Sequence, residues 1–202
     1  MKNWPSNLRA EKKRSVAVLF PYWGFWESSL DAVEFRNERE AILSDVSEFL
    51  DKNNYRVIRF PFVDSPEVGN SIAGQLMKSE VDAVLILQTM AVPTSHILPV
   101  VESLPGVPIL VWALQNSFSL DDDFSQAEIT SLGATVGTPM LTNYLNRIGR
   151  THRVIFGSYQ ENDFSELMEE LEVATIAGSL KGAKLARIGE SIPGYFCVEA
   201  KS

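Results

Sequence analysis

The chain has few of the residues that build disulfides and transition-metal sites. Its 202 residues include one cysteine, Cys197, and two histidines, His96 and His152. A single cysteine forms no intramolecular disulfide, which fits a reducing compartment, so we expect a cytoplasmic protein. Two histidines so far apart, without paired cysteines, make no zinc motif. We interpret both as surface or capping residues.

Basic charge and long hydrophobic runs are scarce as well. Lys and Arg number 18 against 26 Asp and Glu, for a net charge of −8. Because proteins that follow phosphate backbones carry basic surfaces, nucleic acid is not an expected partner. No run approaches the ~18 apolar residues of a membrane span, so we expect no membrane partner either. The hydrophobic fraction of 45% is instead that of a globular protein with a sizeable core.

Several catalytic and nucleotide-binding motifs are missing. Gly133 and Gly137 lie in a glycine-rich segment that matches neither a Walker loop nor a dinucleotide fingerprint, so we interpret them as close packing or a backbone break. Three aspartates at 121–123 lack the ligand spacing of a calcium loop, which favours a solvated turn that helps start a helix. No Gly-x-Ser-x-Gly nucleophile elbow occurs.

Apolar runs typical of buried strands alternate with amphipathic helical segments along the chain. This alternation predicts right-handed crossovers and a three-layer α/β/α doubly wound parallel sheet, flavodoxin-like or Rossmann-like in order. Pro139 is predicted to open the helix within 125–148, and Gly149 to end it. The predicted strands span 16–20, 56–60, 82–88, 108–112, 153–156 and 184–188, and the other predicted helices span 31–52, 66–79, 94–104 and 161–180.

The same pattern divides the chain into three parts. Residues 1–14 are basic and predict a solvated N-terminal arm that could pack on a partner subunit. Residues 15–183 form the α/β domain. Residues 184–202 resemble the start of a following domain, although a strand that completes the sheet edge would have the same sequence character.

Ligands of open parallel sheets bind beyond the carboxyl ends of the strands, so the loop after the first predicted strand is a candidate binding segment. Segment 21–26 after the first strand contains Tyr22, Trp23 and Trp26. Aromatic rings stack on the apolar faces of sugars, so these three side chains could form the wall of a sugar pocket. A buried cluster or a subunit contact would explain them equally. Their bulk argues against a flavin or phosphate loop, which needs small residues and free backbone amides.

Polar side chains follow the third and fourth predicted strands. Gln88 and Thr89 end the third strand, and Gln115 and Asn116 follow the fourth. Amides and hydroxyls both donate and accept hydrogen bonds, as sugar hydroxyls require. Capping of the loops is the alternative role for these residues.

Four segments, 104–115, 130–137, 146–150 and 186–195, together resemble the N-terminal region of the L-fucose isomerase and L-arabinose isomerase family. The resemblance implies an aldose–ketose isomerase in which a divalent ion, usually manganese, and two carboxylates act from later domains. This chain has no positions that match those ligands. In the family, the N-terminal domain closes the active site of a neighbouring subunit. The matching positions here are Tyr22, Trp23 and Trp26 with Gln115 and Asn116.

Two functions follow as expectations. The first is the N-terminal domain of a sugar isomerase-like protein, which closes the substrate pocket and assembles a homo-oligomer, while the metal-dependent catalytic part lies outside this chain. Such a chain would bind no cofactor and would be inactive alone. The second is a free-standing sugar-binding or interaction module without catalysis, which would bind its ligand in the same crevice without metal.

Overall fold

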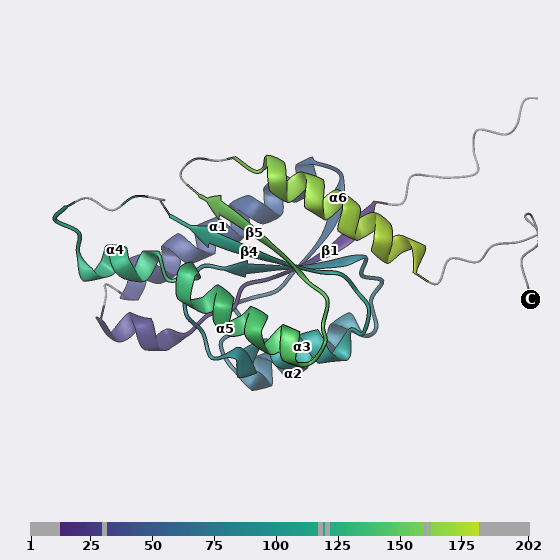
Figure 1. Cartoon of the computed structure of the whole chain (residues 1–202), viewed down its shortest axis with the longest axis horizontal. Helices are drawn as coiled ribbons and strands as arrows, with labels where there is room; N and C mark the ends of the chain where they lie inside the picture. The colour runs from purple at the N-terminus through teal and green to yellow at the C-terminus, as the bar shows by residue number, and fades with distance from the viewer. Residues whose placement is uncertain are drawn as a thin grey trace, which may run out of the picture.

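The computed structural model describes residues 13–29, 32–116, 119, 122–159, 161 and 163–181. Five parallel strands form one sheet in the order β2-β1-β3-β4-β5, with helices on both faces (Figure 1). This arrangement confirms the doubly wound α/β/α sandwich and its flavodoxin-like order. The strands are β1 Arg14–Leu19, β2 Tyr55–Arg59, β3 Ala83–Gln88, β4 Ile109–Gln115 and β5 Arg153–Ser158.

The hydrophobicity of each strand matches its place in the sheet. Every residue of the central strand β3 is buried, because helices cover both of its faces. The edge strand β2 is more exposed, with only Tyr55 of its five residues buried. Continuous apolar runs therefore mark the middle of the sheet, and mixed runs mark its edge.

The helices form two layers that close two separate cores. The first core joins one face of the sheet to α1 and α6, and the second joins the other face to α2, α3 and α5 (Figure 1). The helices are α1 Ala32–Lys52, α2 Pro66–Leu76, α3 Leu98–Ser103, α4 Gln126–Ser131, α5 Ala134–Arg147 and α6 Ser165–Leu180, with 3-10 turns η1 Gly24–Ser29 and η2 Thr94–His96.

The helix around Pro139 differs from its predicted form. Pro139 lies inside α5, which begins five residues earlier at Ala134. The N-terminal extension packs against the end of β3: a Cβ at Gly137 would lie 2.1 Å from the carbonyl oxygen of Met90. This packing outweighs the hydrogen bond that proline removes from a helix. Gly149 ends the helix as predicted, with φ of 66°.

Other boundaries shift by smaller amounts. The predicted helix 94–104 is a 3-10 turn followed by the short helix α3, and α2 ends at Leu76 rather than at residue 79. Ser125 caps α4 through a capping box with Glu128, a role that the aspartates at 121–123 were expected to share. Close packing is the correct interpretation of Gly133 and Gly137, since both backbones approach Met90.

Two predicted segments fall largely outside the described residues. β1 begins at Arg14, and most of the predicted arm precedes the described part of the chain. The predicted strand 184–188 and the rest of the segment that ends at residue 202 also lie outside it. No helix in the described ranges combines the length and hydrophobicity that a membrane crossing needs.

Candidate functional site

The loops after β1 and β2 are joined at the carboxyl edge of the sheet. Tyr22 donates its backbone N–H to the carbonyl oxygen of Val63 at 3.1 Å, and Val63 donates to Phe20 at 2.9 Å. This pairing stacks the ring of Tyr22 on Phe62, with centroids 4.4 Å apart. Tyr22 is completely buried and is part of the first core.

The phenol of Tyr22 organises two charged neighbours. Its hydroxyl donates to Glu27 at 2.7 Å, and Glu27 accepts from Arg36 Nε at 3.1 Å. The guanidinium of Arg36 lies over the rings of Tyr22 and Phe62, 5.0 and 5.5 Å from their centroids. Burial and the bond to Glu27 raise the pKa of Tyr22, while that bond lowers the pKa of Glu27. Tyr22 is therefore neutral at physiological pH and donates to Glu27, and Glu27 in turn holds Arg36 in position.

The two tryptophans form a half-buried cluster beside this layer. Trp23 stacks on Phe25 at 4.6 Å and meets Trp26 edge-on at 5.9 Å. The indole N–H of Trp26 donates to the carbonyl oxygen of Ala91 at 2.8 Å, which ties the β1 loop to the segment after β3. Both indoles also pack on the first core. These rings crowd the β1 loop, where a phosphate would need open backbone amides.

Gln88 ends β3, and Thr89 follows it directly. Gln88 donates to the carbonyl oxygen of Met90 at 2.5 Å and lies beside Gly137 of α5. Thr89 is 2% exposed, and its hydroxyl has no hydrogen-bond partner. His96 was expected to be a surface or capping residue, but it is buried, with Nδ1 3.1 Å from the carbonyl oxygen of Tyr22. Its contact with the β1 loop explains that burial.

Gln115 and Asn116 are half-buried at the end of β4. The side-chain amide of Asn116 donates to Glu38 of α1 at 2.5 Å, and the backbone carbonyl oxygen of Asn116 accepts from the Ser158 hydroxyl at 3.0 Å. Asn116 thus connects α1 with the ends of two neighbouring strands.

Arg39 is the feature that the sequence analysis missed. Its side chain is fully buried on α1, with Nη1 paired to Glu38 and the guanidinium 4.3 Å from the ring centroid of Phe35. Nε and Nη2 have no hydrogen-bond partner. Burial lowers the pKa of Arg39, while Glu38 opposes that effect. An available signal was its spacing, four residues after Phe35 and three before Ile42, on the apolar stripe of the helix.

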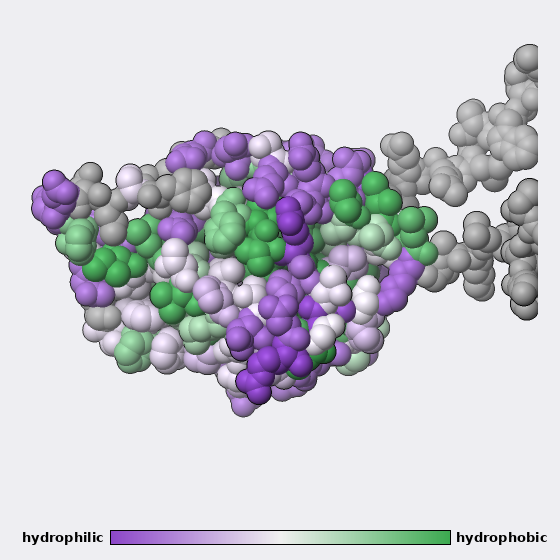
Figure 2. Space-filling model, in the orientation of Figure 1, coloured by the Kyte–Doolittle hydropathy of each residue, from purple (hydrophilic) through white to green (hydrophobic). Residues whose placement is uncertain are grey.

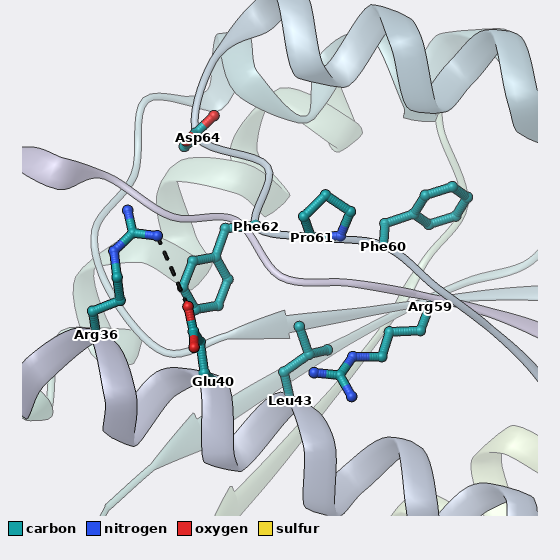
Figure 3. A pocket seen from close by; sticks show the side chains of 8 residues that line it. All are labelled: Arg36, Glu40, Leu43, Arg59, Phe60, Pro61, Phe62 and Asp64. Atoms are coloured by element: carbon teal, nitrogen blue, oxygen red, sulfur yellow. Dashed lines mark ion pairs between the residues drawn. The ribbon is translucent and has the colours of Figure 1, made fainter.

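A pocket of about 470 Å³ opens between α1 and the segment after β2 (Figure 3). Leu43, Phe62 and Pro61 supply apolar surface, and Figure 3 shows Arg36 and Glu40 side by side on one wall. Their charged groups are 3.9 Å apart. Its volume is within the range of small-molecule sites. The complete lining is Arg36, Glu40, Leu43, Arg59, Phe60, Pro61, Phe62 and Asp64.

None of the seven predicted site residues lines this pocket. Tyr22 supports the pocket from behind its lining, because its ring contacts two lining residues, Phe62 and Arg36. Trp23 and Trp26 cluster together, and Asn116 binds the opposite flank of α1. The lining was missed because Arg36 and Glu40 have the sequence character of a solvated helix face. Arg59 and Asp64 are distant from Arg36 and Glu40 in the sequence, because the rest of α1 and most of strand β2 lie between them.

No group of three or more potential metal ligands occurs among the described residues. The described residues therefore form no such cluster for manganese, whose ligands the family resemblance assigns to later domains. No known protein-family model matches the chain, and no curated protein matches it either. The functional proposal is therefore based on the residues at the carboxyl edge of the sheet.

Proposed function

We propose that this α/β domain binds a sugar at the carboxyl edge of its sheet, as the substrate-closing part of an aldose–ketose isomerase-like protein. The observation that carries the proposal is the pocket in Figure 3. It combines apolar surface from Phe62, Pro61 and Leu43 with charged groups at its rim. Sugars present the same combination of apolar C–H faces and hydroxyls.

The rim offers both kinds of hydrogen-bonding group. Arg36 and Arg59 donate, while Glu40 and Asp64 accept. Arg59 also contacts Ser44 of α1 at 3.3 Å, so the two walls are linked across the pocket. A neutral polyhydroxylated ligand suits this alternation better than a strongly charged one, because the four charges cancel.

The role is binding and closure rather than chemistry within this chain. The metal and the two carboxylates that the resemblance implies belong to other domains of the family. The partners in this proposal are a sugar and further copies of the chain, in the cytoplasm. A free-standing sugar-binding module would use the same pocket, and the binding experiment tests the function that the two alternatives share.

The test is a calorimetric titration of the protein with L-fucose and L-arabinose, repeated for Glu40→Gln. We expect binding that Glu40→Gln weakens about tenfold, because a carboxylate that accepts sugar hydroxyls becomes a neutral amide. Glu48→Gln is the matched control. Glu48 lies on the same helix and pairs with Lys52 at i+4, as Glu40 pairs with Arg36 at i−4, but it is outside the pocket.

Two results would contradict the proposal. One is no heat of binding for either sugar at millimolar concentration. The other is equal affinity for the wild type and Glu40→Gln, which would move any sugar site away from this pocket.

A further inference from the structure

A second pocket, of about 420 Å³, lies at the amino ends of β4 and β5 beside the C-terminal half of α6. Its walls are mostly apolar, with contributions from Val107 and Ile109 near the start of β4 and from Val173 of α6. The helix leaves this space open because it carries small side chains there, Ala174 and Ala177. The volume is within the range of small-molecule sites.

Two cations are bound to one turn at this pocket. Arg150 is in the lining, and its Nη2 donates to the first and last backbone carbonyl oxygens of the turn 104–107, at 2.5 and 2.6 Å. Lys181 donates to the carbonyl oxygen of Pro105 in the same turn at 2.7 Å, beside Gly106 of the lining. The amino end of β4 is therefore a positively charged part of the pocket.

The charges of the lining are unequal. Arg153 of β5 pairs with Glu170 of α6 at 2.8 Å, and both residues line the pocket. Burial lowers the pKa of Arg150, and no neighbouring carboxylate opposes this effect among the described residues. Charges that are removed from water are ordinarily paired with an opposite charge. Two arginines and one glutamate in the lining thus leave one positive charge without a counter-ion.

The guanidinium of Arg150 is held in position before any ligand binds. Both carbonyl bonds use Nη2, so Nη1 takes part in neither. Nδ1 of His152 lies 2.9 Å from the backbone carbonyl oxygen of Arg150, which fixes the segment that carries the side chain. A cation that is already fixed binds an anion at a lower entropic cost than a mobile one.

We propose that this pocket binds a small organic carboxylate with an apolar chain or ring, its carboxylate on Nη1 of Arg150 and its apolar part along the walls beside α6. One negative charge matches the single positive charge that lacks a counter-ion. The apolar part matches the side chains of Val107, Ile109 and Val173. A sugar fits less well, because it offers Arg150 no charge.

This site goes beyond the proposed sugar function and is separate from it. The sugar pocket adjoins the carboxyl end of β2, whereas this pocket adjoins the amino ends of β4 and β5, toward the other edge of the described sheet. The two linings share no residue. Failure of the sugar titration therefore has no bearing on the carboxylate, and the reverse also holds.

The test is an amide NMR titration of the protein with sodium octanoate at constant ionic strength. Sodium acetate supplies the carboxylate without the apolar chain, and octanol supplies the chain without the charge. We expect saturable shifts of the amides of Gly106, Thr151 and Ala177 in octanoate, with an affinity about tenfold or more above that for acetate or octanol.

Three results of this titration would count against the proposal. Unchanged amides at these positions in octanoate overturn it. Equal affinity for octanol, or for acetate, overturns the combination of charge and apolar chain. Tighter binding of octyl phosphate than of octanoate overturns the assigned ligand class.

Variants separate a ligand-binding arginine from one that only stabilises the turn. We expect Arg150→Gln to weaken octanoate binding about tenfold or more, because a charged hydrogen bond is lost. Ala177→Leu keeps Arg150 and the turn but fills part of the pocket, so it should also weaken binding, and it serves if Arg150→Gln does not fold.

The matched controls are Arg147→Gln on α5 and Ser179→Leu on α6, since both positions are exposed and outside the lining. Both controls should bind octanoate as the wild type does. Undiminished binding by Arg150→Gln and by Ala177→Leu contradicts the proposal.

Discussion

At the residue scale, Tyr159 links the end of β5 to α1 through its hydroxyl, which donates to Asp45. That hydrogen bond and burial raise the pKa of Tyr159 from 10.0 to about 12. Because the folded pKa lies above the unfolded one, the contribution to stability is complete below pH 10 and disappears as the pH rises to about 12. We predict that the free energy of unfolding falls over this interval.

Tyr159→Phe isolates this contribution. Its free energy of unfolding should be ~1 kcal/mol lower than that of the wild type below pH 10, and the difference should vanish toward pH 12. Tyr22 also has a raised pKa, but it is present in both proteins and cancels in the comparison. Urea unfolding at several pH values measures the difference. A constant difference across the interval would show that the Asp45 bond does not control the titration.

The positions of the residues at the strand ends were predictable in part from the sequence. The position of the aromatic loop follows from the parallel sheet, and so does the placement of Gln88 and Asn116 at its carboxyl edge. The burial of Arg39 was not predicted, because an arginine within a charged helix ordinarily extends to solvent. The pocket beside β2 depends on how α1 crosses that strand, which local sequence patterns do not specify.

At the scale of elements, α5 shows how tertiary packing sets a helix boundary. The local preference of proline for a first turn predicts a start at Pro139, whereas the helix begins at Ala134. The first turns fit because Gly133 and Gly137 allow the backbone of Met90 to approach. The strands were easier to predict, since their apolar runs reflect burial on both faces.

Glycine substitutions test this interpretation of α5. Gly137→Ala would place a Cβ 2.1 Å from the carbonyl oxygen of Met90, so we predict a loss of about 1–3 kcal/mol in the free energy of unfolding. Gly74→Ala in α2 is the matched helical control. Nothing lies within 4 Å of its new Cβ, and we predict a gain of about 0.5–1 kcal/mol. Chemical denaturation measures both, and equal effects would rule out close packing as the role of Gly137.

At the scale of the whole molecule, the outer edge of β5 is the surface that we predict to contact a second copy of the chain. β5 is an edge strand of the described sheet, and Phe156 on it is 62% exposed. Figure 2 shows hydrophobic residues gathered over this strand. Arg153 is paired with Glu170 at 2.8 Å, which reduces the charge that would oppose pairing. Pairing of two such edges about a twofold axis would produce a homo-oligomer of the kind that the sequence analysis expects.

We therefore predict that the protein self-associates and that Phe156→Lys shifts it to the monomer, because a charge on the edge strand opposes pairing with another chain. Sedimentation velocity over a range of concentrations measures the effect. Met77→Lys is the control, since Met77 is also 62% exposed but follows α2, away from β5. A wild type that is monomeric at every concentration contradicts the prediction. An oligomer that survives Phe156→Lys places the subunit contact elsewhere on the molecule.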